Sequence, residues 1–308
     1  MVFKFPNVSI FEVFHRKISY YDKFKKSFDQ EAVLRNLSAR TRKSYWWHIS
    51  DYSNFCKKDP GQTGVSELRA YFQSMLTDGN HKPGSVKMGY YALRFLFKNI
   101  YHREWAKEYL PTPKVAQTLP QVLSKDEVAD VLAAIDNFKH RTIIMLIYST
   151  GARVSESVNL KLTDIDSRRM QVNIQEGKGL KQRKVPLSPL LLSVLRNYYK
   201  KYKPQYYLFE GAGGKGTHLG ITAVRTICTN ARYRTPHIKK SYTPHTFRHS
   251  FATHHLEQGT NLLVIQRMMG HADLSNTLKY LHVQQLNTGQ VINPLDTLEG
   301  LEELCRNK

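Results

Sequence analysis

Apolar residues recur with helical spacing along most of the chain, which predicts a mainly helical protein. Between Leu37 and Tyr109 the recurrence is that of amphipathic helices, and turn signals at 59–61 and 78–80 separate them. The Pro-rich stretch from Leu110 to Pro120 has no helical period and indicates an extended linker. We predict helices before this linker at Thr41–Phe55, Ser66–Leu76 and Pro83–Tyr101, and a further one within Ser9–Gln30.

The pattern changes after the linker, where a second domain begins. Ser124 and Glu127 have the spacing of a capping box, which predicts the start of a helix that runs to about Ile135. A buried helix is predicted from Arg141 to Ser149, and Gly151 is placed to end it in a left-handed conformation.

Alternating apolar residues on both sides of Gly177-Lys178-Gly179 predict a β-hairpin with a glycine-containing loop. The alternating positions are Met170, Val172 and Ile174 before the loop, and Val185 and Leu187 after it. Helical patterns follow at Pro189–Lys201, Thr222–Tyr233, Thr246–Glu257, Asn261–Met268 and Ser275–Val283. The expected fold class is therefore α+β, mainly α with a small β-sheet, and we expect domains at 1–110 and 121–308 joined by a linker at 111–120.

The charge of the chain indicates a polyanionic partner. The 308 residues carry a net charge of +21, from 46 Lys and Arg against 25 Asp and Glu, which exceeds what solubility requires. Residues 1–110 hold 19 of the basic and 10 of the acidic side chains, so both domains carry part of the excess. We therefore expect both domains to contact the same nucleic acid.

Cysteine usage and hydropathy favour a cytoplasmic protein. Cys56, Cys228 and Cys305 lie far apart and lack the paired spacing of a metal site or a disulfide framework. The apolar stretches are too short and too interrupted for a transmembrane helix, and no export signal is visible, so we expect no membrane partner.

Chemically active side chains cluster late in the sequence. His245, Arg248, His271 and Tyr280 lie within 36 residues, and Arg153 lies upstream in Gly-Ala-Arg-Val-Ser-Glu. A phenol that attacks a phosphodiester needs to be held in line, with cations on the non-bridging oxygens and an acid for the leaving hydroxyl. These residue types supply all three requirements.

In this order the motifs resemble the tyrosine recombinase (phage integrase) family, most specifically from Leu119 to Leu298. The resemblance implies an N-terminal helical SAM-like core-binding domain and a catalytic domain that together enclose the DNA duplex. It implies a site-specific DNA recombinase that cleaves and rejoins strands through a covalent 3′-phosphotyrosine, without a metal or another cofactor. The implied assembly is a homotetramer on double-stranded DNA recombination sites.

The resemblance assigns catalytic roles to six residues. Tyr280, nine residues after His271, matches the nucleophile. The two arginines would stabilise the transition state, because a guanidinium grips phosphate with two donors and stays charged when desolvated. Lys178 would protonate the leaving 5′ oxygen, and the two histidines would donate hydrogen bonds or exchange protons. The six are Arg153, Lys178, His245, Arg248, His271 and Tyr280.

The neighbours of these residues are expected to play supporting parts. We expect Glu156 to be a structural partner of Arg or backbone groups, and His249, one helical turn after His245, to support the site without acting directly. His245 and His249 also have a spacing that can bind zinc, but Thr246 stands where zinc hydrolases need Glu. For Lys181, Arg183 and Lys184 we expect contacts to the DNA backbone, and for His254 and His255 partial exposure or a supporting position.

Two other functions stay open at this point. A type IB topoisomerase shares the phosphotyrosine chemistry, and a non-catalytic DNA-binding relative would keep the fold alone. The N-terminal helical domain and the hairpin-to-Tyr spacing favour recombination over the first, and competent residues at all six positions argue against the second.

The C-terminal tail carries its own pattern. Residues 282–296 look similar to the integron-integrase branch, yet the stretch between Tyr207 and His245 is too short for the extra helix of that branch. Leucines spaced by three indicate a short helix with one apolar face, which would pack on its own domain or on a neighbouring subunit. These leucines are Leu295, Leu298, Leu301 and Leu304.

Overall fold

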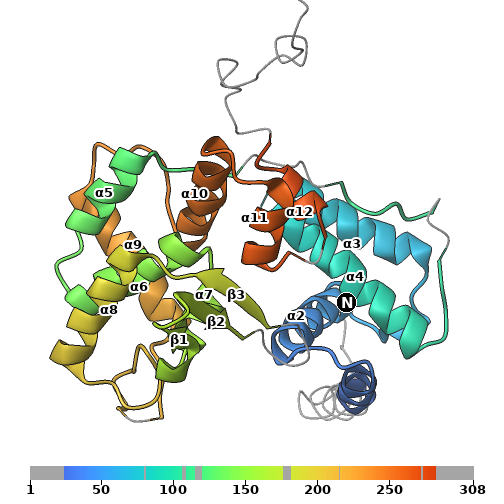
Figure 1. Cartoon of the computed structure of the whole chain (residues 1–308). Helices are drawn as coiled ribbons and strands as arrows, with labels where there is room; N and C mark the ends of the chain where they lie inside the picture. Colours follow the sequence, from blue (N-terminus) through green and yellow to red (C-terminus); the bar gives the residue numbers. More distant parts are fainter. Residues whose placement is uncertain are drawn as a thin grey trace, which may run out of the picture. The chain divides into compact units, whose positions relative to one another are not determined.

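The chain forms two compact units, Met1–Gln117 and Thr118–Lys308, each with its own hydrophobic core. The computed structural model describes residues 24–79, 81–105, 109–114, 120–175, 182–214, 216–271 and 273–281. Most elements in these ranges are helices, accompanied by a three-stranded sheet, which confirms the predicted fold class (Figure 1). No helix in the described ranges is long and apolar enough to cross a membrane.

The three helices predicted in the first unit are present. They are α2 (Ala39–Cys56), α3 (Val65–Thr77) and α4 (Pro83–Asn99), with a 3-10 turn η1 (Pro60–Gln62), and residues 24–34 form a further helix. Aromatic side chains fill the core between them, and the buried hydroxyls of Tyr52 and Tyr71 donate to Thr63 and Asp51 at 2.7 Å each. The part of Ser9–Gln30 before residue 24 lies outside the described residues.

The second unit is built around α6. Its helices are α5 (Lys125–Ala133), α6 (Phe138–Thr150), α7 (Val154–Asn159), α8 (Pro189–Tyr202), α9 (Ile221–Arg234), α10 (Pro244–Glu257), α11 (Leu262–Met269) and α12 (Ser275–Leu278), with a 3-10 turn η2 (Leu162–Asp164). Helix α6 is buried on most sides and packs against α5, α7, α8, α9 and α10 (Figure 1). The capping box at Ser124 is confirmed, since its hydroxyl accepts from the Glu127 amide and the Glu127 carboxylate accepts from the Ser124 amide.

The sheet confirms the hairpin and adds a strand. Strands β2 (Gln171–Ile174) and β3 (Arg183–Pro186) pair antiparallel, with Val172 opposite Val185. The strand β1 (Ile165–Asp166) pairs with β2. Because β1 has only two residues, alternation of apolar and polar positions could not predict it from the sequence. The loop predicted around Lys178 lies outside the described residues.

Three boundaries were predicted wrongly. Met170 does not begin a strand but ends a turn with φ of 51°, and Leu187 follows β3 and donates its amide to the Met170 carbonyl. The last helix was expected to run from Ser275 to Val283, yet α12 ends at Leu278. Tyr280 and Leu281 then donate to carbonyls three residues back, a tighter turn than an α-helix makes. The tail from residue 282, including its leucines, lies outside the described residues.

Gly151 ends α6 in the left-handed region, as predicted, with φ of 63°. A methyl group here would lie 2.5 Å from Cδ1 of the buried Phe251 side chain on α10. The close approach of α6 to α10 therefore depends on this glycine, and it places the Gly151 carbonyl beside the residues of the site described below.

We expect Gly151→Ala to lower the free energy of unfolding by more than about 2 kcal/mol, because left-handed strain and overpacking against Phe251 add. Gly259→Ala is the matched control, since φ there is 81° and the space around it is open, so only about 1 kcal/mol should be lost. Urea unfolding of both variants measures the difference. Equal losses would show that the Phe251 ring moves aside at no cost.

Candidate active site

Three of the six predicted residues line one cavity in the second unit. The cavity has a volume of about 260 Å³ and is lined by Pro120, Arg153, His249, His271, Asn276, Lys279 and Tyr280. Arg153 precedes α7, His249 lies on α10, and the remaining lining residues from His271 onward follow α11. Segments more than 100 residues apart in the sequence therefore meet here.

Tyr280 is held in this cavity with its hydroxyl shielded from solvent. The side chain is only 2% exposed, and its hydroxyl lies 2.9 Å from Nδ1 of His249. The ring lies nearly parallel to that of His271, at 7° with 6.5 Å between centroids. Burial raises the pKa of Tyr280 to about 12, although the charge of Arg248 acts in the opposite direction. The phenol is therefore protonated at neutral pH.

The two histidines beside Tyr280 are neutral. Burial, followed by the positive charges around them, lowers the pKa of both His249 and His271 to about 4. Nδ1 of His271 lies 2.9 Å from the hydroxyl of the buried Thr277, which fixes the ring orientation. A neutral imidazole has one nitrogen that accepts hydrogen bonds, so Nδ1 of His249 can accept one from the Tyr280 hydroxyl.

Arg248 lies beneath the cavity and not on its wall. Its buried guanidinium donates to the carbonyls of Gly151 and Met269, the latter at 2.6 Å. These carbonyls belong to the C-terminal ends of α6 and α11, where unsatisfied acceptors carry partial negative charge. Burial, together with repulsion from Arg153, lowers the pKa of Arg248 to about 10, so it stays charged at neutral pH.

Arg153 and Glu156 hold each other at the start of α7. The Glu156 carboxylate accepts from the Arg153 amide at 2.6 Å and from its Nη1 at 2.8 Å, which confirms Glu156 as a structural partner. Arg153 Nη2 donates to the Gly270 carbonyl at 3.0 Å, while the side chain keeps 36% exposure toward the cavity. Burial alone would raise the pKa of Glu156, but hydrogen bonds and charge from Arg183 and Arg153 outweigh it and lower the pKa.

Arg183 occupies the other side of the same carboxylate. Its Nη1 and Nη2 donate to the two oxygens of Glu156 at 3.0 and 2.7 Å, and its Nε donates to the Met268 carbonyl at 2.7 Å. The side chain is only 9% exposed. The expectation that Arg183 contacts the DNA backbone is therefore wrong, because its donors are used inside the protein.

Of the two other predicted residues, the structure describes only His245, which is not among the residues that line the cavity. His245 is exposed on the first turn of α10, and partial desolvation with the charges of Arg248, Arg225 and Arg153 lowers its pKa. Its position on the same helix as Arg248 keeps it near the cluster. Lys178 lies outside the described residues.

His249 and Arg183 are the residues that sequence reasoning undervalued. His249 was expected only to support the site, yet it contacts the Tyr280 hydroxyl, a partner 31 positions away. The adjacency of His249 to Arg248 was the available signal, but local spacing does not identify a distant partner. For Arg183 the signal was its place on the predicted hairpin strand beside an inward-facing valine.

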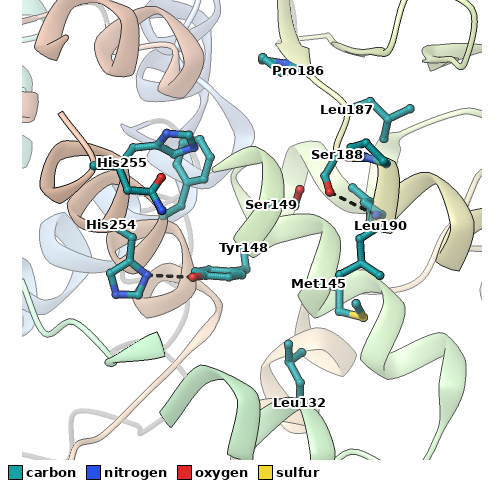
Figure 2. Close-up of a pocket in the computed structure, with 14 residues that line it drawn as sticks. Leu132, Met145, Tyr148, Ser149, Pro186, Leu187, Ser188, Leu190, His254 and His255 are labelled. Carbon is teal, nitrogen blue, oxygen red and sulfur yellow. Dashed lines mark hydrogen bonds between the residues drawn. The ribbon is translucent and has the colours of Figure 1, made fainter. Parts of the chain in front are cut away.

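His254, for which partial exposure or a supporting position was expected, is buried. Its Nδ1 lies 2.8 Å from the Tyr148 hydroxyl, beside a second, largely apolar cavity of about 520 Å³ (Figure 2). The second cavity shares no lining residue with the first. His254 therefore belongs to the packing of α10 on α6 and not to the cluster around Tyr280.

Comparison with known proteins identifies the chain. Residues 121–286 match the Phage integrase family, and residues 24–107 match the Phage integrase N-terminal SAM-like domain. This chain belongs to the phage integrase family. It is a tyrosine-type site-specific recombinase, and the resemblance inferred from the motifs is confirmed.

Several known proteins align with this recombinase over most of its length. It is 36% identical over 275 residues to y4qK of Sinorhizobium fredii, named as a candidate integrase/recombinase, with 89% of each chain covered. It is 32% identical over 276 residues to the tyrosine recombinase XerA of Pyrococcus furiosus, covering 89% of this chain and 95% of XerA. The fold is similar to that of lambda integrase, solved as a dimer bound to a COC′ core site, with a TM-score of 0.69, 17% identity, and 85% and 94% of the two chains covered.

Because His249 and His271 are neutral in the folded protein, we predict that the protein loses stability in acid. Their pKa is about 4 in the folded protein and about 6.5 in an unfolded chain, so between these values the unfolded state binds more protons. The free energy of unfolding of this recombinase should therefore fall as pH is lowered from 6.5 toward 4. His271→Gln should make that dependence shallower, which urea unfolding at a series of pH values measures. The same slope in the variant would contradict the assignment.

Proposed function

We propose that this recombinase cuts and rejoins DNA strands through a covalent 3′-phosphotyrosine formed by Tyr280. The observation that supports this most directly is a buried phenol that lies beside a neutral imidazole, shares its cavity with Arg153 and is affected by the charge of Arg248. A phosphodiester placed in the cavity would meet a nucleophile, a proton acceptor and fixed positive charge together.

The proposed step is a transesterification, in which one phosphate ester bond forms as another breaks. The Tyr280 oxygen bonds to phosphorus, the bond from phosphorus to the 5′ oxygen breaks, and the phenol proton passes to Nδ1 of His249. Arg153, exposed to the cavity, would bind a non-bridging oxygen, while Arg248 adds charge from below. We propose that Lys178 protonates the 5′ oxygen and that His245 and His271 complete the hydrogen bonds to the phosphate. Reversal of the step with another 5′ hydroxyl rejoins a strand.

Access to the nucleophile is restricted in the free protein. The Tyr280 hydroxyl is almost solvent-free and is satisfied by His249, so it has to turn toward the phosphate before it can attack. The segment that carries it is a tight turn after a four-residue helix. We propose that binding of the recombination site supplies this movement.

Double-stranded DNA is the proposed partner of both units. The net charge of +21 supports it, as does the lambda integrase structure, which contains a core site. We propose that residues 1–110 bind the core site and residues 121–308 perform the chemistry, joined by a linker at 111–120. Four subunits on two sites would then exchange strands in pairs.

Tyr280→Phe should bind DNA as the wild type does but form no covalent adduct, because the ring that packs beside His271 remains while the attacking oxygen is lost. Labelled suicide substrates on denaturing gels measure the adduct, and joined products from two DNA molecules distinguish recombination from topoisomerase-like nicking and closing. Tyr242→Phe is the control, since that hydroxyl is buried against Thr235. An adduct that persists in Tyr280→Phe would place the nucleophile elsewhere.

Lys178→Ala should slow cleavage about a hundredfold or more, because the 5′ oxygen then leaves without a proton. A substrate with a 5′ thiol as leaving group needs no proton and should recover most of the lost rate. Single-turnover cleavage of the two matched substrates by wild type and variant measures this recovery. A variant that stays slow on the thiol substrate would assign the acid to another residue, with His271 the next candidate.

A further inference from the structure

One carboxylate joins the arginines of this site. Glu156 accepts from Arg153 on one side and from Arg183 on the other, and its Oε2 lies 3.9 Å from Nη1 of Arg248. Three guanidinium groups therefore share one acidic side chain, and the group as a whole keeps a net charge of +2 at neutral pH.

The C-terminal end of α11 binds the same three arginines that surround Glu156. Three consecutive carbonyls at this end each accept from a different guanidinium. The pairs are Met268 with Arg183, Met269 with Arg248, and Gly270 with Arg153. The next residue is His271, so the position of α11 sets the arginines and this histidine together. Arg183 connects β3 to both Glu156 and α11.

We propose that Arg183 is a positioning residue for strand cleavage, which fixes the Glu156 carboxylate and the end of α11 so that Arg153 and Arg248 face the scissile phosphate. The proposal rests on the proposed function. Arg183 itself does not touch DNA, because its side chain is only 9% exposed and its three donor atoms are bound within the protein.

Loss of Arg183 would act on the other two arginines. Glu156 would then have Arg153 as its remaining close partner, with Arg248 at 3.9 Å, and would turn toward them. The net charge of the group would fall from +2 to +1 just where charge develops in the transition state. Because neither change removes a contact to the DNA, cleavage should suffer far more than affinity.

Stability alone does not account for this arrangement. Replacing a buried ion pair by apolar residues is often neutral or stabilising, since desolvation of the charges offsets their attraction. The apolar neighbour Val185 on β3 shows that the strand already contributes to the core. The proposed alignment of Glu156 and the end of α11 therefore accounts for a charged residue at position 183.

The test compares Arg183→Met, Arg183→Lys and the control Arg141→Met, which removes an Arg side chain that donates to the Ile135 carbonyl in the same unit. Three quantities are measured for each: the melting temperature, DNA affinity, and the single-turnover rate of adduct formation at saturating suicide substrate. We expect Arg183→Met to slow cleavage about thirtyfold or more with affinity within about threefold of wild type. Arg183→Lys should recover the rate only in part, because one ammonium group cannot replace the three donor atoms. Arg141→Met should keep the wild-type rate.

A double-mutant cycle with Arg153→Lys separates alignment from general destabilisation. Because Arg183 acts partly through Arg153, Arg183→Met should slow the Arg153→Lys enzyme by a clearly smaller factor than it slows the wild type. Three outcomes would each overturn the proposal. Arg183→Met could slow cleavage by the same factor in the wild-type and Arg153→Lys proteins, Arg183→Met could cleave at the wild-type rate, or Arg141→Met could lose as much rate as Arg183→Met. If Arg183→Met does not fold, the cycle is run with Arg183→Lys and the same criteria apply.

The experiment also separates this proposal from the one on which it rests. Adduct formation by the wild-type protein, lost in Tyr280→Phe, establishes the phosphotyrosine chemistry before any Arg183 variant is compared. With that chemistry present, a wild-type rate in Arg183→Met overturns only the role of Arg183. If the wild type forms no adduct, both proposals fail.

Discussion

A buried guanidinium must find acceptors inside the protein, and the site of this recombinase is arranged around that requirement. Arg248 is buried and the side chain of Arg183 is only 9% exposed, and together with Arg153 they bind one carboxylate and the carbonyl ends of two helices. Helix ends provide acceptors without adding full negative charge, so the cluster is held firmly and stays positive. Gly151, Met269 and Gly270 therefore matter through their backbones, and the packing of α6, α10 and α11 determines where the positive charge lies.

The same burial sets the protonation of the residues beside it. His249 and His271 stay neutral because solvent is scarce and the neighbouring charges are positive, and Tyr280 stays protonated because solvent is scarce. A phenol that keeps its proton next to an imidazole that can accept one is the pairing the proposed chemistry needs. The charge of Arg248 thus acts to lower the pKa of both partners of that transfer.

Sequence patterns predicted what is decided locally. The capping box at Ser124, the left-handed Gly151 and the pairing of the hairpin strands each depend on a few adjacent residues, and each is present. Motif order also identified the family, and Arg153, His271 and Tyr280 do line one cavity. Local pattern placed Met170 in a strand and extended α12 too far, because turn geometry there overrides apolar spacing.

What the sequence did not reveal depends on contacts across the fold. A basic residue on a hairpin between other basic residues looks like a surface charge, and only the position of Glu156 on α7 makes Arg183 its partner inside the protein. The contact between His249 and Tyr280 joins α10 to the turn after α12, which no spacing rule connects. Side-chain partners at long sequence separation are set by how the helices pack, which a single sequence does not encode in any short motif.

The burial of Tyr280 bears on how often such an enzyme would break DNA outside its recombination site. Phosphotyrosine exchange conserves bond energy, so under the proposed chemistry nothing thermodynamic prevents a free nucleophile from breaking whatever duplex the basic surface happens to hold. A +21 protein must meet random DNA far more often than its own site. Under that proposed chemistry, a phenol that is 2% exposed and bound to His249 would make encounter and breakage separate events, so that most collisions with DNA would leave the strands intact.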